Sequence, residues 1–552
     1  MNSTTRRHFL IGASASLIAA ASSSNSQEAQ LQANRLFAHG IASGDPTQDS
    51  LIIWTRISVI VATTVRWQVS KDADFSQIVK QGERLANGYA DYTVKVDVTG
   101  LSPGEVYYYR FLVGEVQSET GRTKTLTVGH LDKLSFAVVS CSNYPFGYFN
   151  AYEHIAEDDD IDFVLHLGDY IYEYSRKSWG SAFGVLLDRE HVPANEIITL
   201  ADYRARHAQY KTDNGSKLMH AAHPLIPTWD DHESTNNPYL HGAKNHQKNE
   251  GDWYTRRAAS LQAYFEWMPI RDPKRDSDRA KLWRHFQFGD LASLVTLETR
   301  HTGRSKQLSY DTELADIKDQ HSRDKFVEQQ IYDPSRKVLH AEMEAFLVDK
   351  LSQSKSKQQP WRLIGNQIPM ARVMMPDIRG HINTQHSDFS SNQKNKLKKA
   401  MQIGKWHLPV SLDTWNGYGA AREQFYNLCQ TAHAEDLLVF TGDSHCFWAN
   451  QLHSKNGTKM GFEIGTTSVT SPGSFAYFGP YTRKFEELLR EQNEEVLWAN
   501  CEHRGYVKTR LTAKHAKVDY IAMRTVTERS TESFIQRSMT IEHSNKGLEY
   551  SF

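Results

Sequence analysis

The most informative segment of the chain is Asp162-Phe-Val-Leu-His-Leu-Gly-Asp-Tyr-Ile-Tyr-Glu173. Its first half is an apolar run typical of a buried β-strand, and the run stops at a glycine followed by a carboxylate. Open α/β sheets bind their ligands just beyond the carboxyl ends of their strands. The stretch therefore predicts a strand over residues 162–167 and a functional aspartate, Asp169, directly behind it.

Four further apolar runs end in polar clusters of the same kind. The runs and the clusters that follow them are 134–140 before Cys141-Ser142-Asn143, 225–229 before Asp230-Asp231-His232-Glu233, 361–365 before Asn366-Gln367, and 437–441 before Gly442-Asp443-Ser444-His445. One polar turn after a strand carries little information. Five in series are specific, because Cys, Asp, His and Asn are metal-ligand types. We therefore expect a metal-binding cleft in an α/β (α+β) domain, and helical spacing predicts helices at 200–211, 256–267 and 340–354.

Residues 37–126 have a different pattern. Strand-like runs, separated by Pro and Gly turns, lie at 50–56, 65–70, 92–98 and 106–112. Their spacing predicts an all-β sandwich domain, and Gly100-Leu-Ser-Pro103 with Tyr107-Tyr-Tyr-Arg-Phe111 resembles a fibronectin type III-like module. The run contains no catalytic cluster, so we expect a packing or docking role. Farther along, the polar stretch 382–399 is expected to form an exposed loop or insertion.

The chain begins with the pattern of an export signal. Arg6-Arg7-His8-Phe9-Leu10 precedes a short apolar stretch, 11–21, and then small and polar residues. This order resembles the bacterial twin-arginine signal; a general secretory signal that carries two arginines is the alternative. We expect residues 1–30 to be a signal peptide, the twin-arginine translocation machinery to be a partner during export, and the mature protein to be periplasmic or secreted. No later apolar run approaches the roughly 20 residues of a membrane span, so no transmembrane anchor is expected.

Composition narrows the class of protein further. Hydrophobic residues make up 39% and charged residues 23% of the 552 residues, as in an ordinary globular protein of two or more domains. The formal net charge of −1 provides no global basic field that would favour nucleic acid or anionic membranes. The four cysteines include no CxxC pair, so a zinc knuckle is not expected. Disulfides among Cys429, Cys446 and Cys501 remain open.

The polar clusters, in this order, resemble those of the calcineurin-like metallophosphoesterases and, within them, the PhoD-like alkaline phosphatase/phosphodiesterase branch. The motifs that carry the resemblance are His39-Gly-Ile-Ala-Ser-Gly-Asp-Pro46, His166-Leu-Gly-Asp-Tyr-Ile-Tyr-Glu173, Trp229-Asp-Asp-His-Glu233 and Thr441-Gly-Asp-Ser-His445. The resemblance covers residues 37–520. It implies a metallophosphoesterase β-sandwich flanked by helices over residues 134–520, followed by a C-terminal segment, 521–552. It also implies metal-dependent hydrolysis of phosphate esters.

The resemblance implies a first metal site around Asp169, which would bridge two metals. Cys141 falls where the superfamily has its first aspartate, Tyr172 lies three residues after Asp169, and His445 ends the last motif. Thiolate, phenolate and carboxylate are three anionic donors. They suit a highly charged ion such as Fe(III) better than Zn(II).

The second metal would be held by oxygen donors. The resemblance assigns Asp169, Asp231 and Asp443 to it, with Asn366 or Gln367 completing the set. Oxygen donors favour Ca²⁺ over zinc or manganese. Asp230 or Asn236 could replace Asp231 as the ligand, and both alternatives stay open.

The implied mechanism needs no protein nucleophile. Two cations about 4 Å apart would acidify a bridging water, and the resulting hydroxide would attack phosphorus in line. The predicted catalytic residues are Asp169 and His232. His232 takes the place of the superfamily's catalytic histidine and would protonate the leaving group or stabilise the attacked phosphate. Arg300 and Arg304 are weaker candidates for phosphate contact, since structural salt bridges also explain them.

Two other functions compete with a phosphomonoesterase. A phosphodiesterase or phospholipase-D-like hydrolase could use the same residues, because sequence does not separate monoester from diester substrates. A non-catalytic surface protein that binds phosphate or a glycan through the β domain is a more distant alternative. The complete set of metal-ligand types argues against it.

Overall fold

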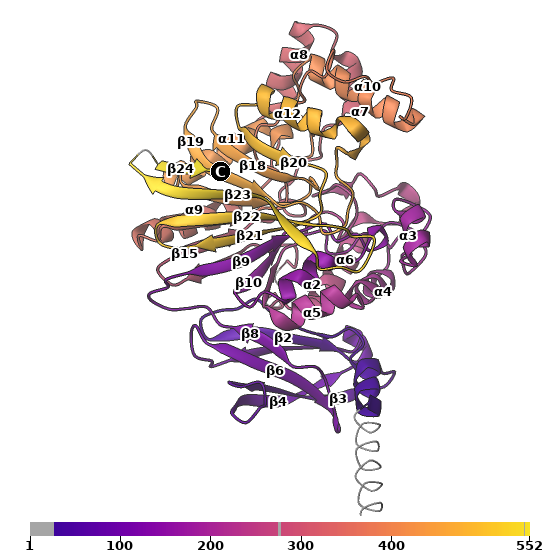
Figure 1. Ribbon diagram of the computed structural model, residues 1–552, viewed down its shortest axis with the longest axis vertical. Coiled ribbons are helices and arrows are strands. Elements are labelled where there is room, and N and C mark those ends of the chain that lie inside the picture. The colour runs from indigo at the N-terminus through magenta and orange to yellow at the C-terminus, as the bar shows by residue number, and fades with distance from the viewer. Residues whose placement is uncertain (1–26, 274–277, 546) are drawn as a thin grey trace, which may run out of the picture.

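The computed structural model describes residues 27–273, 278–545 and 547–552 (Figure 1). The predicted signal peptide lies outside the described residues, except for positions 27–30. Across the described ranges, no helix combines the length and the apolarity that a membrane span requires.

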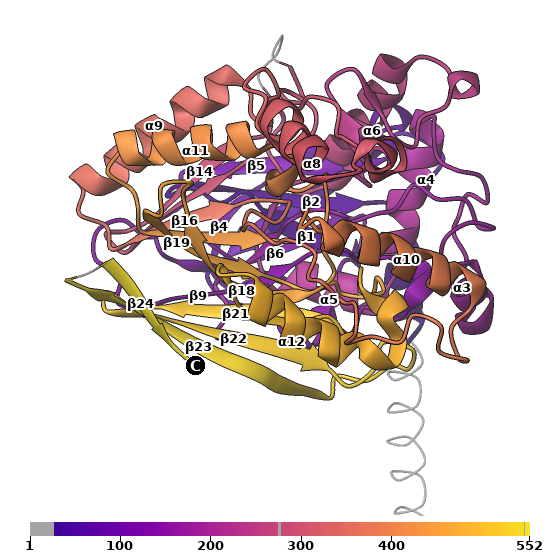
Figure 2. The same ribbon diagram turned by 90° about the horizontal axis from the view of Figure 1, so that it is seen from above.

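Two large β-sheets form the body of the molecule (Figures 1 and 2). The ten strands of the first are, in spatial order, β24 (Gly547–Ser551), β23 (Ser533–Ser544), β22 (His515–Met523), β21 (Gly505–Leu511), β9 (Leu134–Val139), β10 (Phe163–His166), β11 (Leu225–Pro227), β1 (Ile41–Gly44), β2 (Ser50–Arg56) and β5 (Thr93–Thr99). The seven strands of the second are β14 (Arg284–Phe288), β15 (Ala292–Thr296), β16 (Trp361–Gly365), β17 (Leu437–Thr441), β19 (Lys459–Gly465), β18 (Phe447–His453) and β20 (Val496–Asn500). The five runs predicted to precede polar clusters are β9, β10, β11, β16 and β17. Within each sheet these strands are neighbours and run parallel to one another.

The two sheets pack face to face around an apolar core. Buried side chains of the first sheet, such as Phe136 and Leu165, join buried side chains of the second, such as Leu363 and Phe440. Helices α9 (Ala341–Ser356) and α11 (Gly419–Thr431) cover the outer face of the seven-stranded sheet (Figure 2). On the outer face of the other sheet lie α2 (Asn150–Ala156), α4 (Leu200–Lys211), α5 (Asn214–Ala222) and α6 (Trp253–Trp267). The predicted mixed α/β fold is confirmed.

The three predicted helices correspond to α4, α6 and α9. The predicted ends of α4, residues 200 and 211, are also the observed ends. A capping box at Thr199 and Asp202 starts α4, because the two residues satisfy each other's free backbone N–H groups. The remaining helices include α3 (Ser181–Leu187), α7 (Tyr310–Glu313), α8 (Gln320–Phe326) and α12 (Thr482–Gln492).

The prediction of a loop over residues 382–399 is wrong for the second half of that stretch, because helix α10 (Ser391–Lys405) begins there. A capping box at Ser390 and Gln393 starts this helix. Its buried residues Leu397, Ala400 and Ile403 are three positions apart, so they form a narrow apolar stripe. Because lysine and amide side chains separate these apolar residues, the stripe is not apparent from the sequence.

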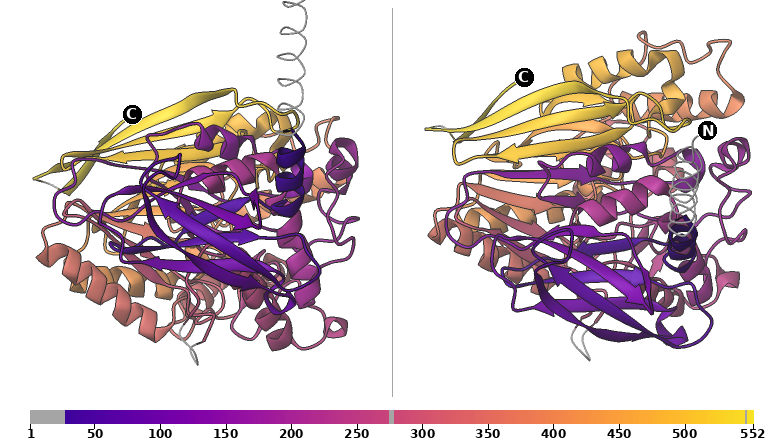
Figure 3. Two further views of the ribbon diagram at one scale, coloured as in Figure 1. Left: turned by 90° about the horizontal axis from the view of Figure 1, so that it is seen from below. Right: turned by 60° about the horizontal axis from the view of Figure 1, so that its bottom comes forward.

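The N-terminal residues form the predicted all-β sandwich. Its outer sheet consists of β4 (Ile78–Ala86), β3 (Thr63–Ser70), β6 (Val106–Val113), β7 (Val116–Gln117) and β8 (Gly121–Lys124). Its inner sheet is β1, β2 and β5, and the core between them contains Ile53, Val96, Val69 and Phe111. Figure 1 shows these indigo strands at the bottom of the molecule, and the right-hand view of Figure 3 shows them on the opposite side from the yellow β22–β24.

The N-terminal sandwich is continuous with strands β9–β11 of the ten-stranded sheet. Strand β1 pairs in parallel with β11, with Gly44 opposite Leu225. A Cβ at Gly44 would lie 2.5 Å from the carbonyl oxygen of Leu225, so this close approach requires glycine. The ten-stranded sheet therefore crosses the predicted boundary between residues 126 and 134.

The C-terminal residues extend the same sheet at its other edge. The predicted boundary at residue 520 falls inside β22, and β23 and β24 add to it. All four cysteines are free and buried, including Cys429, Cys446 and Cys501, so the disulfides left open by the sequence are not formed.

Candidate metal centre

The polar clusters behind the parallel strands meet at one edge of the two sheets. The backbone N–H of Cys141, after β9, donates to Gly168 O, after β10, at 3.1 Å. In the other sheet, Gly442 N–H, after β17, donates to Gln367 O, after β16, at 2.8 Å. Parallel pairing therefore brings together residues that lie far apart in the sequence.

Four predicted ligands have a left-handed backbone. The φ angles of Cys141, Asp169, Asp443 and His445 are 61°, 57°, 58° and 53°. Such a conformation costs a non-glycine residue about 1–2 kcal/mol and is concentrated at functional sites. Gly168, which precedes Asp169, has φ of 99°, and a Cβ there would lie 2.2 Å from the backbone nitrogen of Asp230. The backbone is thus strained at these positions, and this conformation directs the side chains toward one another.

The first group of side chains contains a thiol, a phenol, a carboxylate and an imidazole. Ligand atoms of Cys141, Asp169 and His445 all lie within 4.8 Å of one another, and all three residues are buried. The hydroxyl of Tyr172 donates to Asp169 Oδ2 at 2.9 Å and lies 3.4 Å from His445 Nε2. His445 Nδ1 lies 2.8 Å from Pro472 O, an acceptor that leaves Nε2 free as a ligand. The structure brings these four predicted ligands together.

The second group consists of carboxylates together with the imidazole of His232. Asp169, Asp231 and His232 form one set of ligand atoms within 4.8 Å, and Asp230, Asp231 and Asp443 form another. Asp169 belongs to the first group as well, so it is the residue shared by both. Asp231 belongs to both carboxylate sets, whereas Asp230 belongs to one.

The charges of this centre favour a bound cation. Burial raises the pKa of Asp169 and Asp230 well above the ordinary value, and raises that of Asp443 to about 7. Asp230 Oδ2 and Asp231 Oδ1 have no hydrogen-bond partner among the described residues. Buried carboxylates are costly unless they are paired or coordinate a metal, so the donor set fits a metal centre.

Comparisons with known proteins identify the family. A model of the PhoD-like phosphatase family matches residues 136–520, and a model of that family's N-terminal domain matches residues 20–127. The chain belongs to the PhoD-like phosphatase family. It is 34% identical over 529 residues to alkaline phosphatase D of Bacillus subtilis (strain 168), covering 93% of this chain and 82% of that protein. It is 32% identical to the solved structure of PhoD, with a TM-score of 0.75 and coverage of 94% of this chain and 92% of that one. The chain is a metal-dependent phosphoric ester hydrolase.

His232 of this PhoD-like phosphatase contacts both groups of predicted metal ligands. Its Nδ1 is 2.6 Å from Glu173 Oε2, and its ring stacks on that of Tyr172 with 4.2 Å between centroids. Burial lowers the pKa of His232, but the carboxylates of Asp231, Glu173 and Asp169 outweigh it and raise the pKa well above its ordinary value. The predicted catalytic histidine is therefore held protonated beside the cluster.

Arg300 connects the carboxylates of the phosphatase site. Its guanidinium donates to Asp230 at 2.5 Å, to Asp413 at 2.7 Å and to Asp443 at 3.3 Å. Arg304 pairs with the same Asp413 at 2.5 Å. Both arginines therefore form structural salt bridges, which was the alternative to phosphate contact.

Sequence reasoning missed Asp413. It lies in a loop that follows no apolar strand, so no pattern marks it. Glu173, the partner of His232, is part of a quoted motif but had been assigned no role.

The amides after β16 make hydrogen bonds within the fold. Asn366 Nδ2 donates to Ile368 O at 2.7 Å, and Asn366 Oδ1 accepts from Trp415 Nε1 at 3.2 Å. Gln367 Oε1 accepts from Thr299 at 2.7 Å. Both side-chain amides are thus hydrogen-bonded to neighbouring residues. The role of Asn366 as a metal ligand stays a prediction.

Proposed function

We propose that this phosphatase binds a ferric ion through Cys141, Asp169, Tyr172 and His445. The supporting observation is the buried cluster of one thiol, one phenol, one carboxylate and one imidazole. Burial raises the pKa of both Cys141 and Tyr172 well above the ordinary values. A strongly charged cation is therefore what would stabilise their anionic forms.

One or more Ca²⁺ ions would occupy the adjoining carboxylates. Asp169, Asp231 and Asp443 supply oxygen donors, and Asn366 would complete the set. Hard oxygen ligands favour Ca²⁺. When bound, the cations would supply Lewis acidity, lower the pKa of water and neutralise charge on the phosphate.

The protein's own groups would handle the proton and the substrate. His232 would donate its proton to the leaving oxygen, while Glu173 fixes the ring through Nδ1. Arg300 holds Asp230 and Asp443 in place for the reaction.

A phosphodiesterase that uses the same residues remains the alternative. A hollow of about 230 Å³ borders Asp443 and is lined by apolar side chains that include Trp448, Phe475 and Tyr477. The alcohol group of a monoester, or one alcohol arm of a diester, could occupy this space.

We further propose that the protein is exported by the twin-arginine route to the periplasm or beyond. The support is Arg6-Arg7-His8-Phe9-Leu10 with the short apolar stretch behind it. The N-terminal sandwich would be a fibronectin type III-like packing domain. Western analysis of cell fractions, with Arg6→Lys/Arg7→Lys as the variant, tests the export route: cytoplasmic retention of the variant is expected, and unchanged export would contradict it.

The catalytic proposal is tested by activity and metal content together. Natively exported protein should hydrolyse p-nitrophenyl phosphate or bis-p-nitrophenyl phosphate, and mass spectrometry should find iron and calcium in it. Asp169→Asn should lose both activity and metals because Asp169 is shared by the two groups. An active wild-type enzyme that contains zinc and no iron would reject the ferric assignment.

A further inference from the structure

A pocket of about 490 Å³ opens beside the metal centre. Asn237 and Asp413 line it. The backbone N–H of Asn237 donates to Asp231 Oδ2 at 2.9 Å, and Asp413 pairs with Arg300. The inner wall of the pocket is therefore built from residues that contact the metal centre.

The pocket also adjoins the apolar hollow that borders Asp443. The two cavities share Val410, Ser411 and Tyr477 as lining residues. A substrate whose phosphorus lies at the metals could therefore extend one arm past Asp443 and into the larger pocket.

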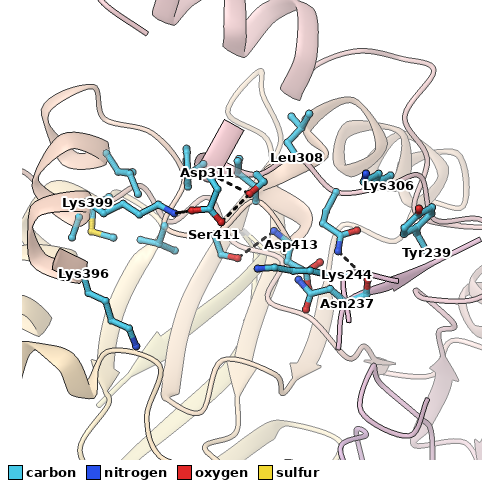
Figure 4. A pocket seen from close by; sticks show the side chains of 18 of the residues that line it. Asn237, Tyr239, Lys244, Lys306, Leu308, Asp311, Lys396, Lys399, Ser411 and Asp413 are labelled. Atoms are coloured by element: carbon cyan, nitrogen blue, oxygen red, sulfur yellow. Dashed lines mark hydrogen bonds and ion pairs between the residues drawn. The ribbon is translucent and has the colours of Figure 1, made fainter. Parts of the chain in front are cut away.

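Four lysines surround this larger pocket. Lys396 and Lys399 project from α10 on one side, and Lys244 and Lys306 lie on the opposite side (Figure 4). They come from three segments that are distant in the sequence, so the tertiary fold gathers them.

The carboxylates of the pocket neutralise only one of these four lysines. Asp311 pairs with Lys399 at 2.5 Å, and Asp413 is held by Arg300 and Arg304. Across the described part of the chain, Lys244, Lys306 and Lys396 have no carboxylate within ion-pair distance. The pocket thus has a local excess of positive charge, although the whole chain has a net charge of −1.

We propose that this pocket is a subsite for a second phosphate group of the substrate. Ammonium groups that face one another across a hollow attract a polyvalent anion, and a phosphate offers acceptor oxygens to several of them at once. The preferred substrates are then phosphate esters whose alcohol arm carries another phosphate. This inference rests on the proposed hydrolysis at the metal centre and adds the substrate class.

The test uses matched pairs of chromogenic diesters. Each pair is a p-nitrophenyl alkyl phosphate whose alkyl chain ends in either a hydroxyl or a phosphate, prepared with chains of increasing length. For the best chain length, kcat/KM for release of p-nitrophenol should be roughly tenfold higher or more with the terminal phosphate. The preference should weaken as salt is added.

The triple variant Lys244→Gln/Lys306→Gln/Lys396→Gln should lose this preference and keep wild-type turnover of the hydroxyl-terminated ester. Lys394→Gln is the matched control, since Lys394 lies on α10 but does not line the pocket, and it should keep the preference. Equal kcat/KM for both members of every pair, or a preference that survives in the triple variant, would overturn the subsite.

Calorimetry separates this inference from the proposed function. Wild-type protein should bind an alkanediol bisphosphate more tightly than the corresponding alkyl monophosphate, and the triple variant should bind both equally. If neither these diesters nor p-nitrophenyl phosphate is turned over, the proposed hydrolysis fails. The binding difference still decides the subsite: its presence supports the second-phosphate site and its absence rejects it.

Discussion

Tyr172 is the residue whose chemistry is most diagnostic of the metal. Its phenol oxygen accepts from Ser471 at 2.8 Å and contacts Asp169 and His445. Burial raises its pKa well above the ordinary value, so a phenolate forms there only beside a strong cation.

Tyr172→Phe should abolish or shift a visible charge-transfer band. A phenolate bound to Fe(III) absorbs visible light, whereas phenylalanine offers no ligand oxygen. Absorption spectra of purified wild-type and variant proteins measure this. Tyr170→Phe is the control, because the Tyr170 hydroxyl contacts Ser216 and His220 and does not face the metal groups. An equally coloured Tyr172→Phe protein would contradict the assignment.

His232 and Glu173 determine the expected pH dependence. The raised pKa of His232 keeps the ring protonated, so activity that needs its proton falls as the pH rises through that pKa. His232→Asn should reduce kcat by roughly 10²–10⁴-fold. Glu173→Gln removes one of the carboxylates that raise the pKa, so the alkaline decline of kcat should begin at lower pH. A pH–rate profile unchanged by Glu173→Gln would argue against His232 as the acid.

At the scale of elements, the decisive features are the loops that end parallel strands. The loop after β10 must pass within contact distance of the loop after β11, and glycine at position 168 permits this. Five strand ends thus present side chains to one edge, as parallel strands of α/β folds do.

Gly168→Ala should disrupt the loop after β10. The new methyl would clash with the backbone of Asp230, in addition to the about 1–2 kcal/mol of left-handed strain. We expect a lower melting temperature and less bound metal, measured by calorimetry and metal analysis. Gly129→Ala is the matched control: its φ is 79°, but no atom lies within 4 Å of the new Cβ. Similar losses in both variants would show that strain alone explains the effect.

At the scale of the whole molecule, the ten-stranded sheet joins the N-terminal sandwich to the catalytic half. Arg271 and Arg284 reinforce this junction: both bind Asp45, and Arg284 does so at 3.0 Å. The two parts share one sheet, so we expect them to unfold together.

Removal of the N-terminal sandwich should prevent stable folding of the rest. A fragment of residues 128–552 would expose the edge of β11, a template for aggregation. We expect low soluble yield and no cooperative thermal transition for this fragment, compared with one transition for the full chain. A soluble, active fragment would contradict this prediction.

Metal removal should destabilise the molecule increasingly as the pH rises. The pKa of Asp443 increases from 3.8 to about 7 on folding, so folding without a cation takes up a proton there. The penalty is absent below the unfolded pKa and grows as the pH approaches about 7. Thermal scans of chelator-treated protein across this interval should show a falling melting temperature, and reloaded protein should not. Parallel curves for both would exclude the effect.

The sequence by itself determined the chemistry and the local elements of this protein. Apolar runs predict β9, β10, β11, β16 and β17, since strand formation and burial follow from local pattern. Ligand types follow from residue identity, and the motif order indicates the family. The pattern failed at α10, where a narrow apolar stripe lies among lysines.

Only the tertiary structure decided which of these local features meet. Asp169 lies beside His445, Arg300 connects Asp230 with Asp443, and the lysines of three segments face one pocket. These neighbours depend on strand pairing and sheet packing between distant segments, and a local pattern carries no information about such pairing. The sequence therefore named the donors, and the fold arranged them into a centre.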